Sequence, residues 1–250
     1  MNTMTIIKSI SAALCLNMAV ANAASIGVNF SENNGNQNWL ADSTPIGPLG
    51  IPSVNFNSNN SPNANGPANI VTGSLSAGTV GNLVNNLGDA VAMTVSWSAA
   101  NPYYNSSGTL TNEARLAVGY LDDGGSGALI TAENVPYPIY NVYVLLGSDS
   151  GDEHTSEVPL VNGTPVLSAD FPAYGNLNGS GGGWIEADGT TRGNYVVARN
   201  ITGSSFTIAG QNNTANRIGI AGFVVQQVPE PSSALLGLVG SLALLRRRRA

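Results

Sequence analysis

The sequence predicts an all-β protein, a single β-sandwich of the jelly-roll type, on three observations. Gly, Asn, Ser and Thr are abundant while lysine occurs once, at Lys8, so helices laced with salt bridges are not expected. Several short runs alternate between apolar and polar residues, which is the period of a half-buried strand. Sequence repeats of about 20 to 50 residues are absent, which argues against the alternative, a single-sheet β-solenoid.

The first strands are expected where this alternation is clearest. Apolar residues occupy every second position over 26–30 and again over 91–97, where Ala92, Thr94 and Ser96 face the other way. The run 139–146 is apolar almost throughout and rich in Val and Tyr. It therefore predicts a central strand that is buried on both faces.

A β-hairpin is expected over 158–167, because Asn162-Gly163 separates two short runs and favours a type I′ turn. Further strands are expected over 195–198, 206–209 and 218–225, the last with a bulge near its glycines, Gly219 and Gly222. Only 82–87 and 111–116 suggest short helices. The Asn-, Gly- and Pro-rich stretches 33–69 and 174–183 are expected to be loops.

The N-terminal 23 residues have the pattern of a signal peptide. Lys8 precedes an apolar stretch over 9–20, which ends in Ala21-Asn22-Ala23, a small-x-small site for signal peptidase. Cleavage after Ala23 would also remove Cys15, which Leu14 disfavours as a lipidation site. The mature chain then has no cysteine, so neither disulfides nor cysteine metal sites are expected.

The C-terminal 23 residues predict a membrane segment with a basic stop. Val228-Pro229-Glu230-Pro231 precedes 14 uncharged residues, 232–245, and then Arg246, Arg247, Arg248 and Arg249. As a helix the uncharged run would span about 21 Å at ~1.5 Å per residue, short of a bilayer core of about 30 Å. Snorkelling arginines recover part of the deficit and favour the inner side of the membrane. We therefore expect a single transmembrane helix, against the alternative of a buried helix of the domain.

Taken together, these ends resemble those of the PEP-CTERM proteins of Gram-negative bacteria. The resemblance covers 228–250 and implies a sorting signal that a membrane-embedded exosortase recognises and cuts near Pro-Glu-Pro. It implies a protein that is exported, held briefly in the inner membrane, and then passed to the cell envelope or the exterior. The family is associated with exopolysaccharide and biofilm matrix.

The span between the two signals, 24–227, is long enough for one domain with a substantial core. It contains four arginines and 14 of the 15 acidic residues, so its net charge is 4 − 14 = −10. Such a surface repels nucleic acid and anionic lipid. The predicted organisation is a signal peptide over 1–23, a β-sandwich over 24–227 and a sorting signal over 228–250.

Catalytic motifs are not apparent in the sequence. His154 is the only histidine, so a three-histidine zinc site is excluded, and no nucleophile elbow or phosphate-binding loop occurs. Two acidic, Gly-containing loops could supply oxygen ligands for calcium, through Asp122 and Asp123 and through Asp149 and Asp152. Solvated turns are the alternative reading of both loops. No other cofactor is expected.

Aromatic residues supply the remaining functional signal. Trp97 ends an alternating strand and is expected in the core, whereas Trp184 and the loop pair Tyr103 and Tyr104 are candidates for exposed contact with a glycan. The runs 116–123 and 140–149 loosely resemble strands of galactose-binding-like carbohydrate modules. The main expectation is a non-catalytic envelope or matrix protein. The alternatives are a carbohydrate-binding module and, third, a glycoside hydrolase, which needs two facing carboxylates.

Overall fold

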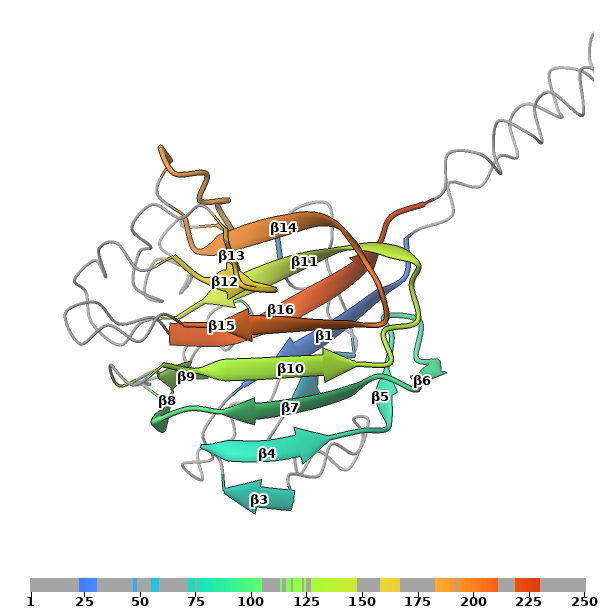
Figure 1. The fold of residues 1–250 in the computed structure, drawn as a ribbon, viewed down its shortest axis with the longest axis horizontal. Helices are drawn as coiled ribbons and strands as arrows, with labels where there is room; N and C mark the ends of the chain where they lie inside the picture. The colour runs from blue at the N-terminus through green and yellow to red at the C-terminus, as the bar shows by residue number, and fades with distance from the viewer. Residues whose placement is uncertain are drawn as a thin grey trace, which may run out of the picture.

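The described part of the computed structural model is a β-sandwich of two facing sheets (Figure 1). Residues described are 23–30, 47–48, 55–58, 72–74, 76–104, 113, 116–117, 119–122, 124, 127–147, 158–166, 183–191, 193–210 and 219–229. Within these ranges only Glu113, Leu116 and Ala117 are helical, and no helix is long and apolar enough to cross a membrane. The predicted signal peptide and C-terminal membrane helix lie outside the described residues, apart from Ala23, Val228 and Pro229 at their boundaries.

The last strand of the domain lies near the centre of the first sheet. The order of this sheet is β14 (Tyr195–Thr202), β11 (Ile139–Leu146), β16 (Gly219–Gln227), β1 (Ser25–Asn29) and β2 (Asn57–Ser58). β9 (Gly119–Asp122) also pairs with the start of β16, and β8 (Asn101–Tyr104) pairs with β9. The first and last strands of the domain, β1 and β16, are thus antiparallel neighbours.

The second sheet lies across the core from the first. Its order is β13 (Thr164–Pro165), β12 (Leu160–Val161), β15 (Ser205–Ala209), β10 (Leu129–Glu133), β7 (Thr94–Ser98), β4 (Ala77–Val80) and β3 (Thr72–Ser74). A separate two-stranded hairpin joins β5 (Leu83–Val84) to β6 (Ala90–Val91). The chain changes sheet between β10 and β11, between β14 and β15, and between β15 and β16, which binds the two layers into one unit.

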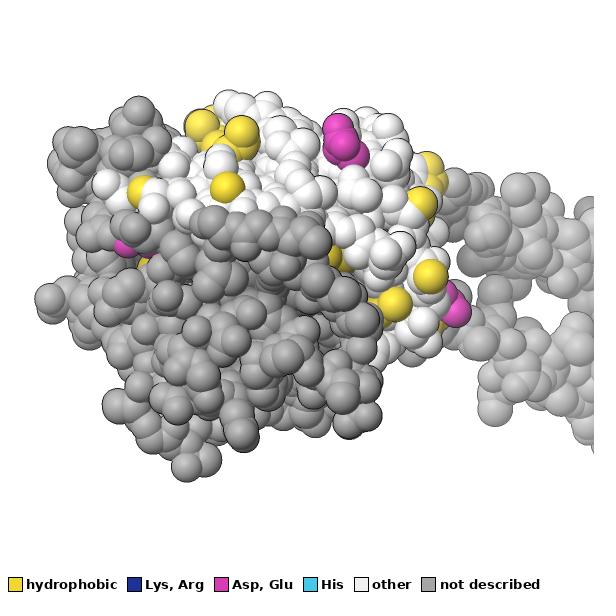
Figure 2. Space-filling view, turned by 90° about the horizontal axis from the view of Figure 1, so that it is seen from below, with side chains coloured by type: hydrophobic (Ala, Val, Ile, Leu, Met, Phe, Trp, Pro, Cys, Tyr) yellow, Lys and Arg dark blue, Asp and Glu magenta, His cyan; other side chains and the backbone are white. Residues whose placement is uncertain are grey.

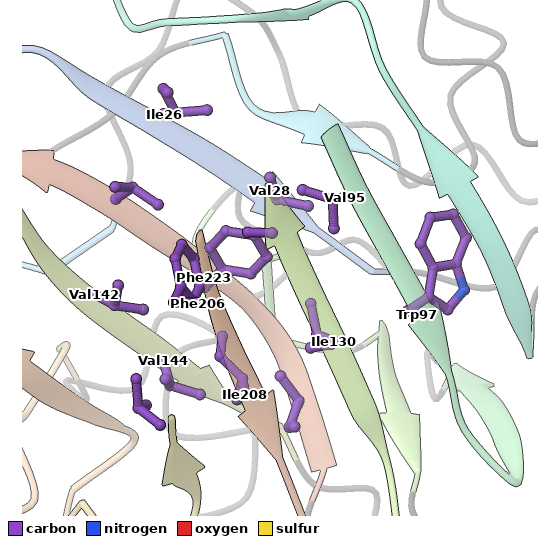
Figure 3. Close-up of a cluster of buried hydrophobic side chains, with 14 of the residues drawn as sticks. Ile26, Val28, Val95, Trp97, Ile130, Val142, Val144, Phe206, Ile208 and Phe223 are labelled. Carbon is purple, nitrogen blue, oxygen red and sulfur yellow. The ribbon is translucent and has the colours of Figure 1, made fainter. Parts of the chain in front are cut away.

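The core is filled by alternate residues of both sheets, as Figure 3 shows for Val142, Val144 and Phe223 facing Val95, Ile130 and Phe206. Phe206 and Phe223 meet edge to face with ring centroids 5.6 Å apart. Trp97 is buried against Phe30 in the same cluster, as predicted. Such aromatic contacts add to the free energy gained by burying apolar area.

A second buried cluster covers the other face of the first sheet. It includes Leu145, Val224 and Tyr195 from the strands and Leu116 and Trp184 from the connections above them. β11 is therefore buried along its whole inner face, whereas on its outer face Leu145 is buried, Tyr143 is half-buried and Ile139 is exposed, so the prediction of burial on both faces holds only for the second half of the run 139–146. This is also why its sequence shows no clean alternation.

Two local backbone features that the sequence predicted, a hairpin turn and a β-bulge, are present in the structure. Asn162 and Gly163 have φ of 52° and 73° between β12 and β13, which confirms the type I′ hairpin. The pairing of β11 with β16 shifts register between Leu145↔Gly222 and Leu146↔Ile220. The bulge predicted near Gly219 and Gly222 is thereby confirmed.

Two local predictions are wrong. The alternating run 91–97 is not one strand, because the chain leaves the β5–β6 hairpin at Val91 and joins the second sheet only at Thr94. The stretch 82–87 is not helical but holds β5 and a turn. Asn85 Oδ1 accepts the backbone N–H groups of Leu87 and Asp89 at 2.9 and 3.0 Å, which closes a turn in place of a helix.

Candidate functional site

A groove of about 620 Å³ lies where the open edges of the two sheets meet. β14 is the edge strand of the first sheet, and the β12–β13 hairpin forms the edge of the second. The segment Glu186–Asp188 lies beside β14 and closes the groove; Glu186 forms a parallel bridge to Tyr195. The lining residues are Val161, Asn162, Thr164, Pro165, Val166, Glu186, Ala187, Asp188, Val197, Ala198, Arg199, Asn200, Ile201 and Thr202.

An ion pair between Arg199 and Glu186 crosses one wall of this groove. One guanidinium nitrogen, Nη2, donates to both carboxylate oxygens of Glu186, at 2.8 and 2.9 Å. The two side chains are 54% and 33% exposed, so solvent screens the pair and it contributes little to stability. Arg199 is the single cationic side chain in the part of the chain that the structure describes. The pair therefore places both signs of charge on a polar wall that is open to solvent.

Asp188 organises the turn at the mouth of the groove. Its Oδ1 accepts the backbone N–H groups of Thr190 and Thr191 at 2.9 and 2.6 Å, and the hydroxyl of Thr190 at 2.8 Å. The hydrogen bond from the backbone N–H of Thr191 has the largest effect on the Asp188 carboxyl, ahead of those from the backbone N–H and the hydroxyl of Thr190. Together they lower the pKa of this carboxyl to about 2. Asp188 is thus a fully ionised carboxylate committed to its turn.

Trp184 lies in the interior, where the sequence had suggested an exposed glycan contact. It is only 9% exposed and packs edge to face on Tyr195 with ring centroids 6.5 Å apart. Its indole N–H donates to the carboxylate of Glu113. The expected exposure is wrong because the chain after the Gly-rich stretch folds back over the outer face of the first sheet instead of projecting from it.

The backbone of the other two aromatic candidates forms a strand and not the expected loop. Tyr103 and Tyr104 belong to β8, paired with Tyr120 and Gly119 of β9, and not to a loop. Their side chains lie outside the described part of the structure, so their role as glycan contacts stays a prediction.

Of the four acidic residues that the sequence suggested as calcium ligands, only Asp122 lies within the described residues. Asp122 ends β9, is 6% exposed, and accepts the N–H of Gly124 at 2.9 Å. Asp123, Asp149 and Asp152 lie outside the described residues. No cluster of three metal-ligating side chains occurs among the described residues, and calcium binding stays a prediction.

The described N-terminal and C-terminal residues of the domain meet at one end of the first sheet. The carbonyl of Ala24 accepts the N–H of Gln227 at 2.9 Å, and the N–H of Val228 donates to the carbonyl of Ile139 at 3.0 Å. Pro229 is exposed directly afterwards. The remaining signal residues, Ala21, Glu230, Pro231 and Arg246 to Arg249, lie outside the described residues.

Sequence reasoning missed the groove and the Glu113–Trp184 pair. Both join segments that are distant along the chain, and the groove contains none of the aromatic side chains that a sequence search for a glycan site looks for. The only local signals were the Asn-Gly turn of the hairpin and the isolated Arg199 in an otherwise neutral strand.

Comparison with known proteins identifies the C-terminal segment. Residues 227–249 match the family model of the PEP-CTERM protein-sorting motif. No curated protein sequence matches the chain. Among solved structures, the comparison finds the native family 35 carbohydrate binding module from Clostridium thermocellum, at 16% identity and a TM-score of 0.33, covering 54% of this chain and 92% of that one.

The motif match agrees with the Pro-Glu-Pro, the uncharged run and the terminal arginines of the sequence. Such a motif implies recognition by exosortase and export with a transient membrane anchor. The chain therefore carries a PEP-CTERM sorting motif at its C-terminus, to which an all-β domain is joined directly.

Proposed function

We propose that the folded domain, a sandwich of the jelly-roll type, is a non-catalytic component of the cell envelope or extracellular matrix. Signal peptidase would release its N-terminus and exosortase its C-terminus. The observation that carries the proposal is the hydrogen bond from the N–H of Val228 to the carbonyl of Ile139. It is the last backbone hydrogen bond at this end of the first sheet before Pro-Glu-Pro begins. Because the sheet ends where the motif begins, a cut at the motif leaves β16 complete and the domain intact.

Mass spectrometry of the secreted protein tests this processing. The expected mature chain begins at Ala24 or Ser25 and ends near Pro231, with Leu235 and all later residues missing. Deleting Arg246 to Arg249 should remove retention and let the chain reach the periplasm uncut. Released protein that still carries Arg249 would contradict exosortase processing.

Matrix association needs its own measurement. In cells that make exosortase and exopolysaccharide, the mature protein should fractionate with the polysaccharide, and in cells without exosortase it should stay with the membrane. A mature protein found only free in the medium, with none in the polysaccharide fraction, would contradict the matrix role.

A carbohydrate-binding module is the second candidate, supported by the groove between β14 and the β12–β13 hairpin. Asn162, Thr164, Asn200 and the Arg199–Glu186 pair supply donors and acceptors of the kind that sugar hydroxyls need. A polysaccharide pull-down tests it with Glu186→Gln in the groove and Glu133→Gln, an exposed carboxylate on β10, as the control. Binding should fall for Glu186→Gln alone. If no polysaccharide is retained by the unmodified protein, the module is excluded for the polysaccharides tested.

A glycoside hydrolase, the third candidate, is the least supported. The groove has two carboxylates, but Glu186 is paired with Arg199 and Asp188 with the turn over 190–191. A general acid in a glycosidase needs a raised pKa, whereas that of Asp188 is lowered to about 2.

A further inference from the structure

The end of the sandwich at which both signals leave carries exposed apolar side chains. Leu87, at the tip of the β5–β6 hairpin, is 67% exposed, and Ile139, at the start of β11, is 36% exposed. Pro136 and Pro138, in the connection before β11, and Pro229 are exposed as well. Figure 2 shows hydrophobic side chains at the right-hand end of the domain, the end at which β1 begins in Figure 1.

Hydrogen bonds fix these residues next to the points where the chain leaves the domain. Ile139 accepts the N–H of Val228 through its carbonyl. The β5–β6 turn is tied to the start of β1, because the N–H of Asn86 donates to the carbonyl of Ser25 at 2.8 Å and the N–H of Ser25 donates to Asn86 Oδ1 at 2.9 Å. Leu87 and Ile139 therefore flank the N-terminal and C-terminal exits.

The length of chain beyond the sheet decides how far this end can lie from the membrane. Val228 is held by the sheet, and the uncharged run begins four residues later, at Ser232. Four residues reach at most about 14 Å when fully extended. The interfacial layer on each side of the hydrocarbon core is about 5 to 8 Å thick. Val228 can therefore lie at most about 6 to 9 Å outside the interfacial layer while the tail is inserted, which keeps this end of the sandwich close to the bilayer surface.

The N-terminal side imposes the same limit before signal cleavage. Ala24 is held by Gln227, and the apolar stretch of the signal peptide ends at Val20, four residues earlier. Both membrane segments thus pull the same end of the sandwich toward one bilayer surface. The net charge of the domain disfavours an anionic surface, and Asp89 and Glu133, both exposed, also lie near this end.

We infer that this end is a membrane-docking surface, in which Leu87 and Ile139 rest in the headgroup layer of the bilayer that holds the tail. Apolar side chains at the rim gain free energy by leaving water for the interface. Docking would fix the orientation of the Pro-Glu-Pro segment at the membrane surface, where a membrane-embedded protease acts. The inference rests on the inserted tail of the proposed function and adds the pose of the domain upon it.

Single-cysteine labelling of the full-length chain tests the pose. With Cys15→Ser as background, Leu87→Cys, Ile139→Cys and Leu129→Cys each carry an environment-sensitive dye, in phosphatidylcholine vesicles with headgroup spin-labelled lipid. Leu129 is the matched control, since it is 46% exposed and lies on β10 about 14 Å from the strand end that leads to β11. We expect a blue shift and quenching at Leu87 and Ile139 and neither at Leu129.

Vesicle flotation of the same samples separates the inference from its premise. Flotation with equal quenching at the three positions, or with none, would overturn docking and leave tail insertion standing. Failure to float would overturn insertion and the docking that depends on it. Shielding of Leu87 and Ile139 only when exosortase is present in the vesicles would overturn the lipid surface in favour of the enzyme.

Discussion

The backbone N–H of Gln227 donates to the carbonyl of Ala24 over 2.9 Å, so the residue after the expected signal-peptidase site is bonded to the residue before the sorting segment. β1 and β16 continue this pairing from Ser25↔Gln226 to Asn29↔Gly222. The first and last strands of the domain therefore lie side by side in the same sheet. Trimming either end by a few residues removes strand pairing from the centre of the sandwich.

Replacing Gln227 with proline should destabilise the domain by about 1 to 3 kcal/mol, because proline removes the N–H that reaches Ala24 and restricts the end of β16. Urea unfolding of the mature domain measures the change. Gln227→Ala keeps the N–H and is the control, with an expected shift within about 0.5 kcal/mol. Equal unfolding midpoints for the two variants would show that the closing bond is dispensable.

Gly222→Ala should destabilise the domain by about 1 to 3 kcal/mol, as overpacking in a core does. A Cβ at position 222 would lie 2.2 Å from the backbone oxygen of Val28, and backbone at the centre of a sheet has little room to move. Gly183→Ala is the control, because a Cβ there meets nothing within 4 Å. The measurement is the difference in chemical unfolding midpoint, and a null effect for Gly222→Ala would mean that the bulge relaxes.

The sequence was most informative where one local cause decides the structure. The run 139–146 became β11 because it is rich in Val, Tyr and Leu, and Asn162-Gly163 became a type I′ turn because both residues accept positive φ. It was least informative where a distant contact decides. The residues next to Trp184 in the sequence do not predict its contacts with Glu113 and Tyr195. The turn after β5 likewise depends on hydrogen bonds to the Asn85 side chain.

The candidate site follows the same division. The sorting motif is a contiguous signal that the sequence alone identifies, and the family match over 227–249 falls on the same segment. The groove is assembled from the edges of two sheets, so its residues acquire a common surface only through the strand order. No spacing rule in a single sequence connects Asn162 to Arg199.

Trp184→Ala should lower the free energy of unfolding by about 3 to 5 kcal/mol, because removing the buried indole leaves a cavity between the connection over 183–188 and the first sheet. A loss of glycan binding in this variant would therefore report unfolding and not a lost contact. Glu113→Gln is the comparison variant, because its amide oxygen still accepts the indole N–H and the expected cost is about 1 kcal/mol. Thermal unfolding of both variants gives the result, and a fully stable Trp184→Ala would contradict the buried placement.

The turn at Asp188 predicts an acid-sensitive contribution to stability. Its pKa is lowered from 3.8 to about 2 in the folded protein, so the contribution is present above pH 3.8 and is lost as the pH falls toward 2. Asp188→Asn removes it at all pH values. The unfolding midpoints of the two proteins should differ at pH 6 and converge near pH 2. A constant difference across this range would contradict the lowered pKa.

The hydroxyl of Tyr137 is buried and has no hydrogen-bond partner in the described part of the chain. Burial raises the pKa of Tyr137 from 10 to about 12, so ionisation favours the unfolded chain, and stability that is intact below pH 10 is lost as the pH rises toward 12. Tyr137→Phe removes the ionisable group and should be stabilising by about 1 kcal/mol at pH 7, because it also removes an unpaired buried hydroxyl. Its alkaline unfolding midpoint should move to higher pH, which circular dichroism between pH 9 and 12 measures. Tyr143→Phe is the control, since the Tyr143 hydroxyl donates to Gln226 Oε1 at 3.0 Å and its loss should destabilise the sheet slightly.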